Sequence, residues 1–476
     1  MVKGFLNKHN CERTYCTNPF KQRIIHHKLK QSSMTTQRFH KFLFLVISGS
    51  FILSSFQLRA GGLMTNTNYH IAFDRMMARG ATFDIDAAYS NPAGLAWGHK
   101  GWQISFNWQM PQQNRDIETT FPLFTTENHT QKYHGKASAP FVPGLFASYS
   151  HNNWVISSMI GIVGSGGFVK YDDGLPMFDA PLMATIYSKT KGLITPDKYT
   201  IDSRVKGKQY IYGGQVCFTY KIGSHWAAAA GIRANYYDGY YRGYVKAAMN
   251  KIDVTLADFE VDCDQVGWGF NPIISVDYHN KNLTLAAKYE FRAKLNIPNK
   301  TNANSDPDGV LYAFRDGAKT RYDMPALLTF AAGYDFSPKF RSTIEYHFFD
   351  DKNAKMANDR QKELTHGTSE FLIGAEYDIN KIFTISAGGQ RTDYGLSDGY
   401  ESNTSFACDS YSVGAGGAIN VNKHLRINLG YFVTLYSDYT KHTEAGNPGY
   451  CNTTLEGTDV YSRTNGVFGI GIDYKF

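Results

Sequence analysis

The chain ends in the sequence Val467-Phe468-Gly469-Ile470-Gly471-Ile472-Asp473-Tyr474-Lys475-Phe476. Large apolar side chains occupy every second position and small or polar ones the positions between, which is the period of a β-strand with two different faces. A phenylalanine that closes such a strand resembles the C-terminal signal recognised by the outer-membrane assembly machinery. The last ten residues therefore point to a β-barrel that spans a membrane.

The same alternation recurs upstream, for example over residues 425–433 and 340–348. Many of these runs exceed the five or six residues usual in globular sheets. Tight polar turns alternate with longer polar stretches near 112–136, 172–199, 250–256, 297–320, 350–367, 395–405 and 439–458. Short turns on one side and long loops on the other are typical of outer-membrane barrels, and lipid favours a closed sheet without edges. We predict an all-β, transmembrane antiparallel barrel of about 14 strands over residues 99–476.

The N-terminal 60 residues differ in charge from the rest. The chain carries +7 overall, and residues 1–60 hold ten Lys or Arg against one Glu, so residues 61–476 carry −2. This near-neutral balance excludes nucleic acid as an expected partner. Residues 34–60 combine basic residues, an apolar run of about a dozen residues and a small residue at the end, which predicts a secretory signal peptide within a leader of residues 1–60.

Residues 61–98 do not alternate and lie before the first strand. Residues 70–79 predict a short helix with Asn68 as N-cap and Gly80 after its end, and Asn91-Pro92-Ala93-Gly94 predict a turn. A compact segment in this place is either a plug for the barrel or a dispensable leader. The even strand number and the terminal Phe476 favour an N-terminal hatch of short helices inside the lumen.

Three stretches resemble the FadL-type outer-membrane transporters of long-chain fatty acids and aromatic hydrocarbons. Residues 79–94 (RGATFDIDAAYSNPAG) are similar to the family's hatch, residues 324–334 (MPALLTFAAGY) to its Pro-Ala strand, and residues 335–340 to the turn that follows. The resemblance covers essentially all of residues 61–476. It implies a 14-stranded barrel with a plugged lumen, and a hydrophobic substrate that leaves sideways through a gap made by an inward kink in the third strand.

The expected third strand, residues 154–171, contains Gly164, Gly166 and Gly167. Glycines clustered within a strand mark a bulge or a bend, so they are candidates for the kink and the lateral gate; the alternative is a flexible strand end at the outer rim. The hatch turn Asn91, Pro92, Ala93 and Gly94 is a candidate for structural support of gating.

Two sets of side chains are candidates for ligand binding. Leu182, Met183 and Ile186 lie in an apolar, predicted helical part of the loop at residues 172–200, which suits capture of an apolar ligand but equally suits packing between loops. A carboxylate head group would need a cation, and strand parity places four of them inward: Arg233, Lys288, Arg292 and Arg341. Inward charges in barrels also pair with acids such as Glu290 and Glu345.

Cys408 and Cys451 fall at strand–loop junctions on the same predicted rim, where an exported protein can form a disulfide. No spacing of Cys and His indicates a metal site, and no nucleophile or phosphate-binding motif is present. We therefore expect no enzyme activity, no metal and no cofactor.

The sequence predicts passive uptake of hydrophobic small molecules, most simply long-chain fatty acids, by a monomer in the lipid of the outer membrane of a Gram-negative bacterium. The alternatives are a porin-like channel for polar solutes and an outer-membrane adhesin or enzyme. Apolar pockets discriminate weakly, so the substrate itself stays open.

Overall fold

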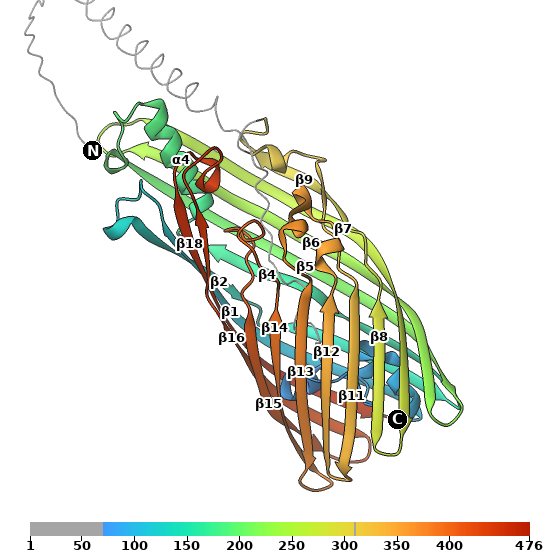
Figure 1. The fold of residues 1–476 in the computed structure, drawn as a ribbon. Coiled ribbons are helices and arrows are strands. Elements are labelled where there is room, and N and C mark those ends of the chain that lie inside the picture. Colours follow the sequence, from blue (N-terminus) through green and yellow to red (C-terminus); the bar gives the residue numbers. More distant parts are fainter. Residues whose placement is uncertain (1–69, 309–310) are drawn as a thin grey trace, which may run out of the picture.

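The computed structural model describes residues 70–308 and 311–476. The predicted leader, including the signal peptide, and residues 61–69 of the predicted hatch lie outside the described residues. The described chain forms one closed barrel with a small helical segment in its lumen (Figure 1).

The wall is a single antiparallel sheet of eighteen segments. They are β1 (Gly101–Thr120), β2 (Thr130–Ser138), β3 (Val142–His151), β4 (Trp154–Tyr171), β5 (Tyr199–Ile222), β6 (Trp226–Met249), β7 (Thr255–Asn280), β8 (Leu283–Glu290), β9 (Asn296–Asn304), β10 (Lys319–Arg321), β11 (Leu327–Ser337), β12 (Phe340–Phe349), β13 (Thr368–Asp378), β14 (Phe383–Asp393), β15 (Ser410–Asn420), β16 (Leu425–Tyr436), β17 (Tyr439–Thr443) and β18 (Gly457–Lys475). Each of the pairs β2/β3, β8/β9, β10/β11 and β16/β17 continues one strand across an interruption. The barrel thus has the 14 strands that the sequence predicted.

The first and last strands close the barrel. β1 pairs with β18 from Gln103 opposite Lys475 to Thr120 opposite Thr458. Along the C-terminal strand Phe468, Ile472 and Tyr474 are exposed on the outside, whereas Gly469, Gly471 and Asp473 face inward, as the alternation predicted.

An apolar belt covers the outside of the wall. Exposed outward side chains include Phe106, Ile156, Phe218, Ile232, Phe270, Phe330, Ile344, Ile373, Val413 and Leu429. Many inward positions of the same strands carry polar side chains, such as Gln103, Ser105 and Asn107 of β1. This outward-apolar, inward-polar alternation is the pattern of a barrel that faces lipid. In the described part of the chain, no helix combines the length and apolar character needed to cross a bilayer.

The strands differ in length around the barrel. β5, β6 and β7 have 24, 24 and 26 residues, whereas β11 to β15 have 10 or 11. About 9–11 residues cross a bilayer, so the long strands extend beyond it, where neither face needs to be apolar. Several predicted polar loops are therefore strand: residues 112–120 and 130–136 belong to β1 and β2, and residues 297–304 and 319–320 to β9 and β10. The predicted loop near 250–256 shrinks to residues 250–254.

The lumenal segment contains α2 (Ile71–Met76), α3 (Ala87–Ser90) and the 3-10 helix η1 (Pro92–Trp97). It lies at the end of the barrel that holds Phe476 (Figure 1). α2 is shorter than the helix predicted for residues 70–79, because Met77 has a φ of 61° and ends it. The predicted N-cap Asn68 lies outside the described residues; His70 caps the helix by accepting a hydrogen bond from Ala72 N at 3.1 Å.

The opposite end carries α4 (Pro176–Lys189) and six 3-10 turns in the connections. These turns are η2 (Glu127–His129), η3 (Pro196–Lys198), η4 (Tyr312–Phe314), η5 (Asp351–Asn353), η6 (Ala357–Glu363) and η7 (Tyr450–Asn452). α4 contains the stretch 181–187 for which the sequence predicted a helix.

Inward glycines let the hatch touch the backbone of the wall. A Cβ on Gly374 or Gly388 would lie 2.1 or 2.0 Å from the carbonyl oxygen of Met76, and a Cβ on Gly414 would lie 2.3 Å from that of Asp74. α2 accordingly packs on β13, β14, β15, β16 and β18. The inward glycines thus allow close packing of the hatch backbone against the wall.

Candidate functional site

The Asn91-Pro92-Ala93-Gly94 turn is tied to two strands of the wall, β5 and β7. Asn91 Nδ2 donates to Asp277 Oδ2 at 3.0 Å, and Ala93 N donates to Ser275 Oγ at 3.2 Å. Thr219 Oγ1 donates to the carbonyl of Pro92 at 2.9 Å. Gly94 passes so close to the hatch backbone that a Cβ would lie 2.5 Å from the carbonyl oxygen of Thr82. The turn thus fixes the plug to β5 and β7, and all four of its residues are buried.

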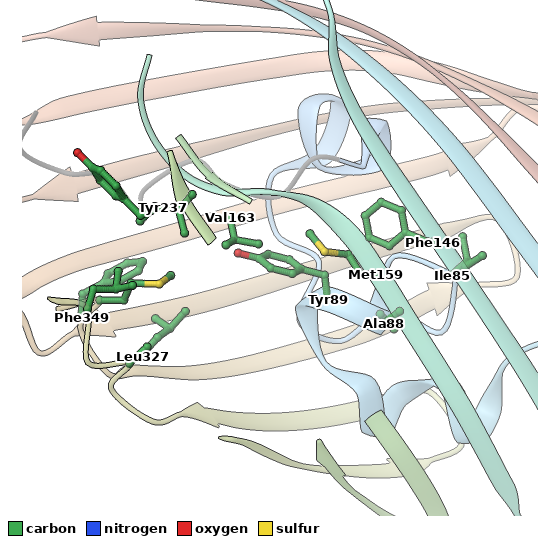
Figure 2. Close-up of a cluster of buried hydrophobic side chains, with 14 of the residues drawn as sticks. Ile85, Ala88, Tyr89, Phe146, Met159, Val163, Tyr237, Leu327 and Phe349 are labelled. Atoms are coloured by element: carbon green, nitrogen blue, oxygen red, sulfur yellow. The ribbon is translucent and has the colours of Figure 1, made fainter. Parts of the chain in front are cut away.

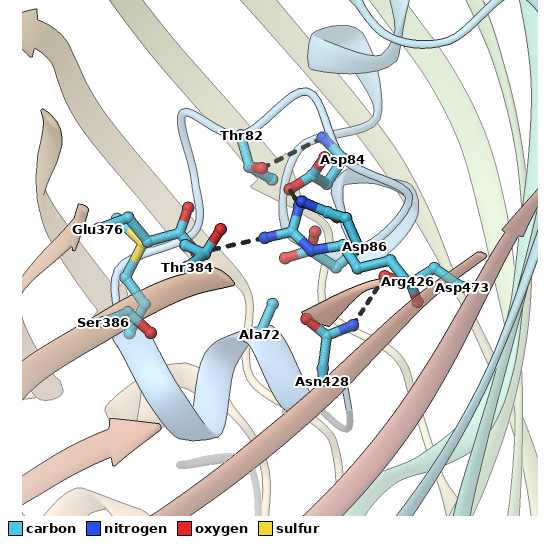
Figure 3. A network of polar contacts seen from close by, with 12 residues as sticks. Ala72, Thr82, Asp84, Asp86, Glu376, Thr384, Ser386, Arg426, Asn428 and Asp473 are labelled. Atoms are coloured by element: carbon cyan, nitrogen blue, oxygen red, sulfur yellow. Dashed lines mark hydrogen bonds and ion pairs between the residues drawn. The ribbon is translucent and has the colours of Figure 1, made fainter. Parts of the chain in front are cut away.

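The other side of the hatch is held by charge. Arg75 in α2 forms an ion pair with Glu376 of β13 and donates to Ser386 Oγ at 2.8 Å. Arg426 of β16 lies between the carboxylates of Asp84 and Glu376, with nitrogen–oxygen distances of 3.6 and 3.8 Å (Figure 3). Buried charges are stable in proteins only when they are paired. The Arg75–Glu376 and Arg426–Asp84 pairs cross between plug and wall, so moving the plug would separate them.

Two of the four predicted cations, Arg233 and Lys288, meet beneath the hatch. Both are buried and share Glu290: Arg233 donates to its two oxygens at 2.7 and 3.0 Å, and Lys288 at 2.8 Å. Lys288 also donates to the carbonyl of Tyr89 at 3.0 Å, and the guanidinium of Arg233 lies 4.8 Å from the centre of the Tyr89 ring. In this arrangement the two cations support the hatch.

Arg341 and Arg292 lie elsewhere and are also compensated. Arg341 donates to Glu376 and Asp378, both at 2.8 Å. Arg292 donates to the carbonyl of Asn353 and lies 3.7 Å from Asp323. The structure therefore does not bring the four predicted cations together into one head-group site.

A buried apolar cluster lies between the hatch and the middle of the wall. Tyr89 of α3 packs there with Met159 and Val163 of β4 and with Tyr237 and Leu327 from the other strands (Figure 2). The remaining members include Ile85, Leu95, Phe146, Ile211, Met324 and Phe349. Sequence reasoning did not single out these residues as a site. The alternation of the strands places Met159 and Tyr237 on the inner face, but it places half of the residues of every strand there, so it could not single out these two.

The wall beside this cluster is interrupted. β3 pairs with β4 only up to Gly144 opposite Gly161, and β2 resumes the pairing with Lys136 opposite Lys170. Residues 162–169 of β4 therefore pair only with β5, and two register shifts occur there, between Ile162 and Gly164 and between Ser165 and Gly167.

The three predicted glycines, Gly164, Gly166 and Gly167, lie in or beside these bulges. Gly167 has a φ of +75°, a conformation that favours glycine. Ile162, which parity would place outside, is only 6% exposed, so the alternation of the strand is broken at this point. The glycines occupy the middle of β4, which continues to Tyr171.

A second apolar site lies at the α4 end. A pocket between this helix and the wall is lined by Met177, Phe178, Pro181 and Leu182 of α4, by Tyr241 and Val245 of β6, and by Phe259, Val261 and Phe314. Of the predicted capture residues, Leu182 lines the pocket. Ile186 is fully buried against the wall with Val245 and Leu256, and Met183 is half-buried beside them. Ile186 thus packs against the wall and does not line the pocket.

α4 is held to the wall by a buried acid. Asp179 accepts hydrogen bonds from Tyr133 Oη at 3.0 Å and from Ser203 Oγ at 2.9 Å. Burial raises the pKa of Asp179 to about 7, against the effect of these two hydrogen bonds. The carboxyl group is therefore partly protonated at neutral pH.

Cys408 and Cys451 are both free thiols, so the predicted disulfide is not formed in the structure. Each sulfur has its own partner: Cys408 Sγ donates to the carbonyl of Tyr461 at 3.7 Å, and Cys451 Sγ to Asn403 Oδ1 at 3.6 Å. In the described ranges, no three His, Cys, Asp or Glu side chains are placed to hold a metal ion.

The fold is similar to that of several solved structures. A FadL homologue of Pseudomonas aeruginosa superimposes with a TM-score of 0.62 at 15% identity, covering 87% of this chain and 100% of that one. The toluene transporter TbuX of Ralstonia pickettii gives 0.53 at 14% identity, covering 88% and 99%, and the toluene transporter TodX of Pseudomonas putida gives 0.53 at 15% identity over the same shares. No protein-family model and no curated protein matches the sequence. The chain therefore has the fold of the FadL-type transport barrels, with a plugged lumen and a closed wall of 14 strands.

Proposed function

We propose that this chain is a transporter in the outer membrane of a Gram-negative bacterium, where it takes up hydrophobic small molecules, most simply long-chain fatty acids, without an energy source. The apolar outer belt suits a lipid environment, and the fold likeness to transport barrels supports the same role. The hatch fills the lumen at the end of the short turns, so a straight aqueous path through the barrel would require it to move.

The observation that carries this proposal is the interrupted wall beside the apolar lumenal cluster. Val163 belongs to that cluster and also to the stretch of β4 that lacks a partner on the β2/β3 side. An apolar ligand resting against Tyr89 and Val163 would thus be next to the break. From there it can reach the lipid without passing the polar contacts that hold the plug, which are those of the Asn91-Pro92-Ala93-Gly94 turn and of Arg75.

The α4 pocket supplies an entry site in this proposal. Each methylene group that leaves water contributes about 0.8 kcal/mol, so an alkyl chain gains affinity with length at an apolar wall without specific contacts. This favours capture of a class of apolar compounds and makes discrimination between chain lengths weak.

A disulfide across the upper edge of the break tests the lateral exit. A Cβ on Gly167 would lie 3.9 Å from the Cβ of Ala137 in β2, within the range for a disulfide. The variant Ala137→Cys/Gly167→Cys should take up radiolabelled oleate slowly when oxidised and recover severalfold after reduction. The reduced form of the same variant controls for strain at residue 167, and Ala137→Cys alone controls for oxidation of the native thiols.

Equal uptake by the oxidised and reduced forms would contradict the lateral exit. Conductance of the intact wild-type protein to small ions in planar bilayers would contradict the plugged transporter and favour a porin-like channel.

A further inference from the structure

A row of basic side chains crosses four neighbouring strands on the outside of the barrel, toward the end that carries α4. Its members are directly opposite one another in the register: Lys136 of β2, Lys170 of β4, Lys206 of β5 and Arg242 of β6. The three lysines are exposed, and each has a buried neighbour in its own strand, so all three point outward. Adjacent strands are about 4.8 Å apart, so these lysines fall within roughly 10 Å of wall.

Other outward positions of the wall place a cation directly opposite an acid. The pairs of this kind are Lys132 and Glu118, Lys246 and Asp258, Lys300 and Asp264, and Arg242 and Asp262. In two of them the charged atoms are 2.8 Å apart, for Lys132, and 2.9 Å apart, for Arg242. Opposite charges in this position stabilise a sheet, whereas like charges destabilise it. The three lysines of the row therefore depart from the pattern that the pairs around them follow.

A single acid lies among these lysines. Lys170 forms an exposed ion pair with Asp172 at 2.7 Å. The hydrogen bond from Lys170 lowers the pKa of Asp172 below its usual value, and the charges of Lys170, Arg204 and Lys136 lower it further. Within residues 70–308 and 311–476, no hydrogen bond or ion pair joins the side chain of Lys136, Arg204 or Lys206 to another residue. The basic patch formed by Lys136, Lys170, Arg204 and Lys206 thus keeps an excess of positive charge.

The basic patch lies directly beyond the apolar belt. On β5 the exposed outward residues include Ile222, Phe218 and Tyr212, and Lys206 and Arg204 follow toward the α4 end. Ile222 is the last residue of β5, and about 9–11 residues from there cross a bilayer, which places Tyr212 at the membrane–water interface. Aromatic residues gather at this level in membrane barrels, whose longer connections face the outside. The patch therefore lies at the level of the head groups of the outer leaflet.

We propose that the basic patch binds the phosphorylated head group of a glycolipid in the outer leaflet, while the acyl chains of this lipid lie against the apolar belt below. Phosphate accepts strong, charge-assisted hydrogen bonds from Lys and Arg. A head group with more than one phosphate can lie between several lysines at once, where it supplies the negative charge that the wall lacks and offsets their repulsion. The adjoining apolar surface favours a lipid over a soluble anion, since only a lipid contacts both. This inference depends on the place of the barrel in the outer membrane and is independent of what the lumen transports.

The test compares two lipids with the same acyl chains. Diphosphoryl lipid A and its fully dephosphorylated form are titrated against the full-length protein in nonionic detergent at physiological salt, and their dissociation constants are measured by native mass spectrometry. The wild type should bind the diphosphoryl form more tightly. The patch variant Lys136→Gln/Lys170→Gln/Lys206→Gln should lose about fivefold in affinity for each charge removed, roughly 100-fold in total. Its binding of the dephosphorylated lipid should stay within about twofold, which also shows that it is folded.

The matched control is Lys132→Gln/Lys246→Gln/Lys300→Gln. It removes the same number of exposed outward lysines and changes the net charge equally, but each of these lysines is directly opposite an acid. Because salt screens charges that lie more than about 8 Å away, this variant should keep the affinity of the wild type for diphosphoryl lipid A within about threefold.

Four results would overturn the proposal. Equal losses in the patch variant and the control would show that net charge alone attracts the lipid. Equal binding of both lipids by the wild type would mean that only the acyl chains are recognised, and a wild type that retains neither lipid would show that no such site exists. Displacement of lipid A by inorganic phosphate at millimolar concentration would assign the patch to a free anion. None of these results bears on the uptake of oleate, which tests the proposed function separately.

Discussion

Replacing Glu290 with Gln tests whether the charged network beneath Tyr89 holds the plug. Glu290 is 1% exposed and lies 2.7 Å from Arg233 and 2.8 Å from Lys288. The amide keeps the size of the side chain but leaves two buried cations without a counter-charge. Removing one partner of a buried ion pair costs about 3–5 kcal/mol. Since Lys288 also donates to the carbonyl of Tyr89, part of this cost should appear as loosening of the hatch.

The matched control is Glu118→Gln, which breaks an exposed pair with Lys132 at the same distance of 2.8 Å. Its side chains are 45% and 64% exposed, so solvent screens the pair and a much smaller loss is expected than for Glu290→Gln. The free energy of unfolding is measured by urea titration in lipid vesicles, and hydrogen exchange is followed over residues 85–97. Equal losses in the two variants would refute the reasoning. A large loss in Glu290→Gln without faster exchange at residues 85–97 would mean that the network stabilises the wall alone.

Two further perturbations follow from the same contacts. Gly388→Ala would place a Cβ 2.0 Å from the carbonyl oxygen of Met76, so we expect the hatch to shift at a cost of about 1–3 kcal/mol. Gly389→Ala is the control, because its Cβ would lie 3.5 Å from the nearest atom and should be tolerated. Urea unfolding compares the two variants, and equal stability would show that α2 does not need Gly388. The folded-state pKa of Asp179, about 7, lies above the unfolded value of about 3.9, so the docked loop binds more protons and its stability falls as pH rises through this window, by a few kcal/mol at most. Limited proteolysis of residues 172–198 should speed up as pH rises from 5 to 8 in the wild type and stay constant in Asp179→Asn; parallel profiles would contradict this assignment.

The wall could be predicted from the sequence because lipid imposes a period of two on every spanning strand. The prediction failed where strands rise above the bilayer, as in β1, β2, β9 and β10. There the outward face can be polar without cost to folding, so the alternation is lost although the backbone still pairs. The alternation of side chains in the sequence thus predicts only the part of each strand that lies in the bilayer.

The partners of inward charges could not be predicted in the same way. Parity places Arg233 inward correctly, but its pairing with Glu290 joins residues on different strands, and it depends on the register and on the position of Tyr89 in the hatch. The glycines show the same limit. Gly164 and Gly167 sit at bulges, whereas Gly388 makes room for a carbonyl of α2, and a single sequence gives both the same letter.

Closure of the barrel brings together residues that no single stretch of sequence contains. Arg115 falls in a region that its polar composition assigned to a loop, and Arg463 is 348 positions further along, so the two meet only because the first strand closes on the last. A like-charged pair directly opposite lowers the stability of a sheet by up to about 1 kcal/mol. The register across the closing seam, which no local sequence pattern encodes, therefore decides which inward side chains become neighbours.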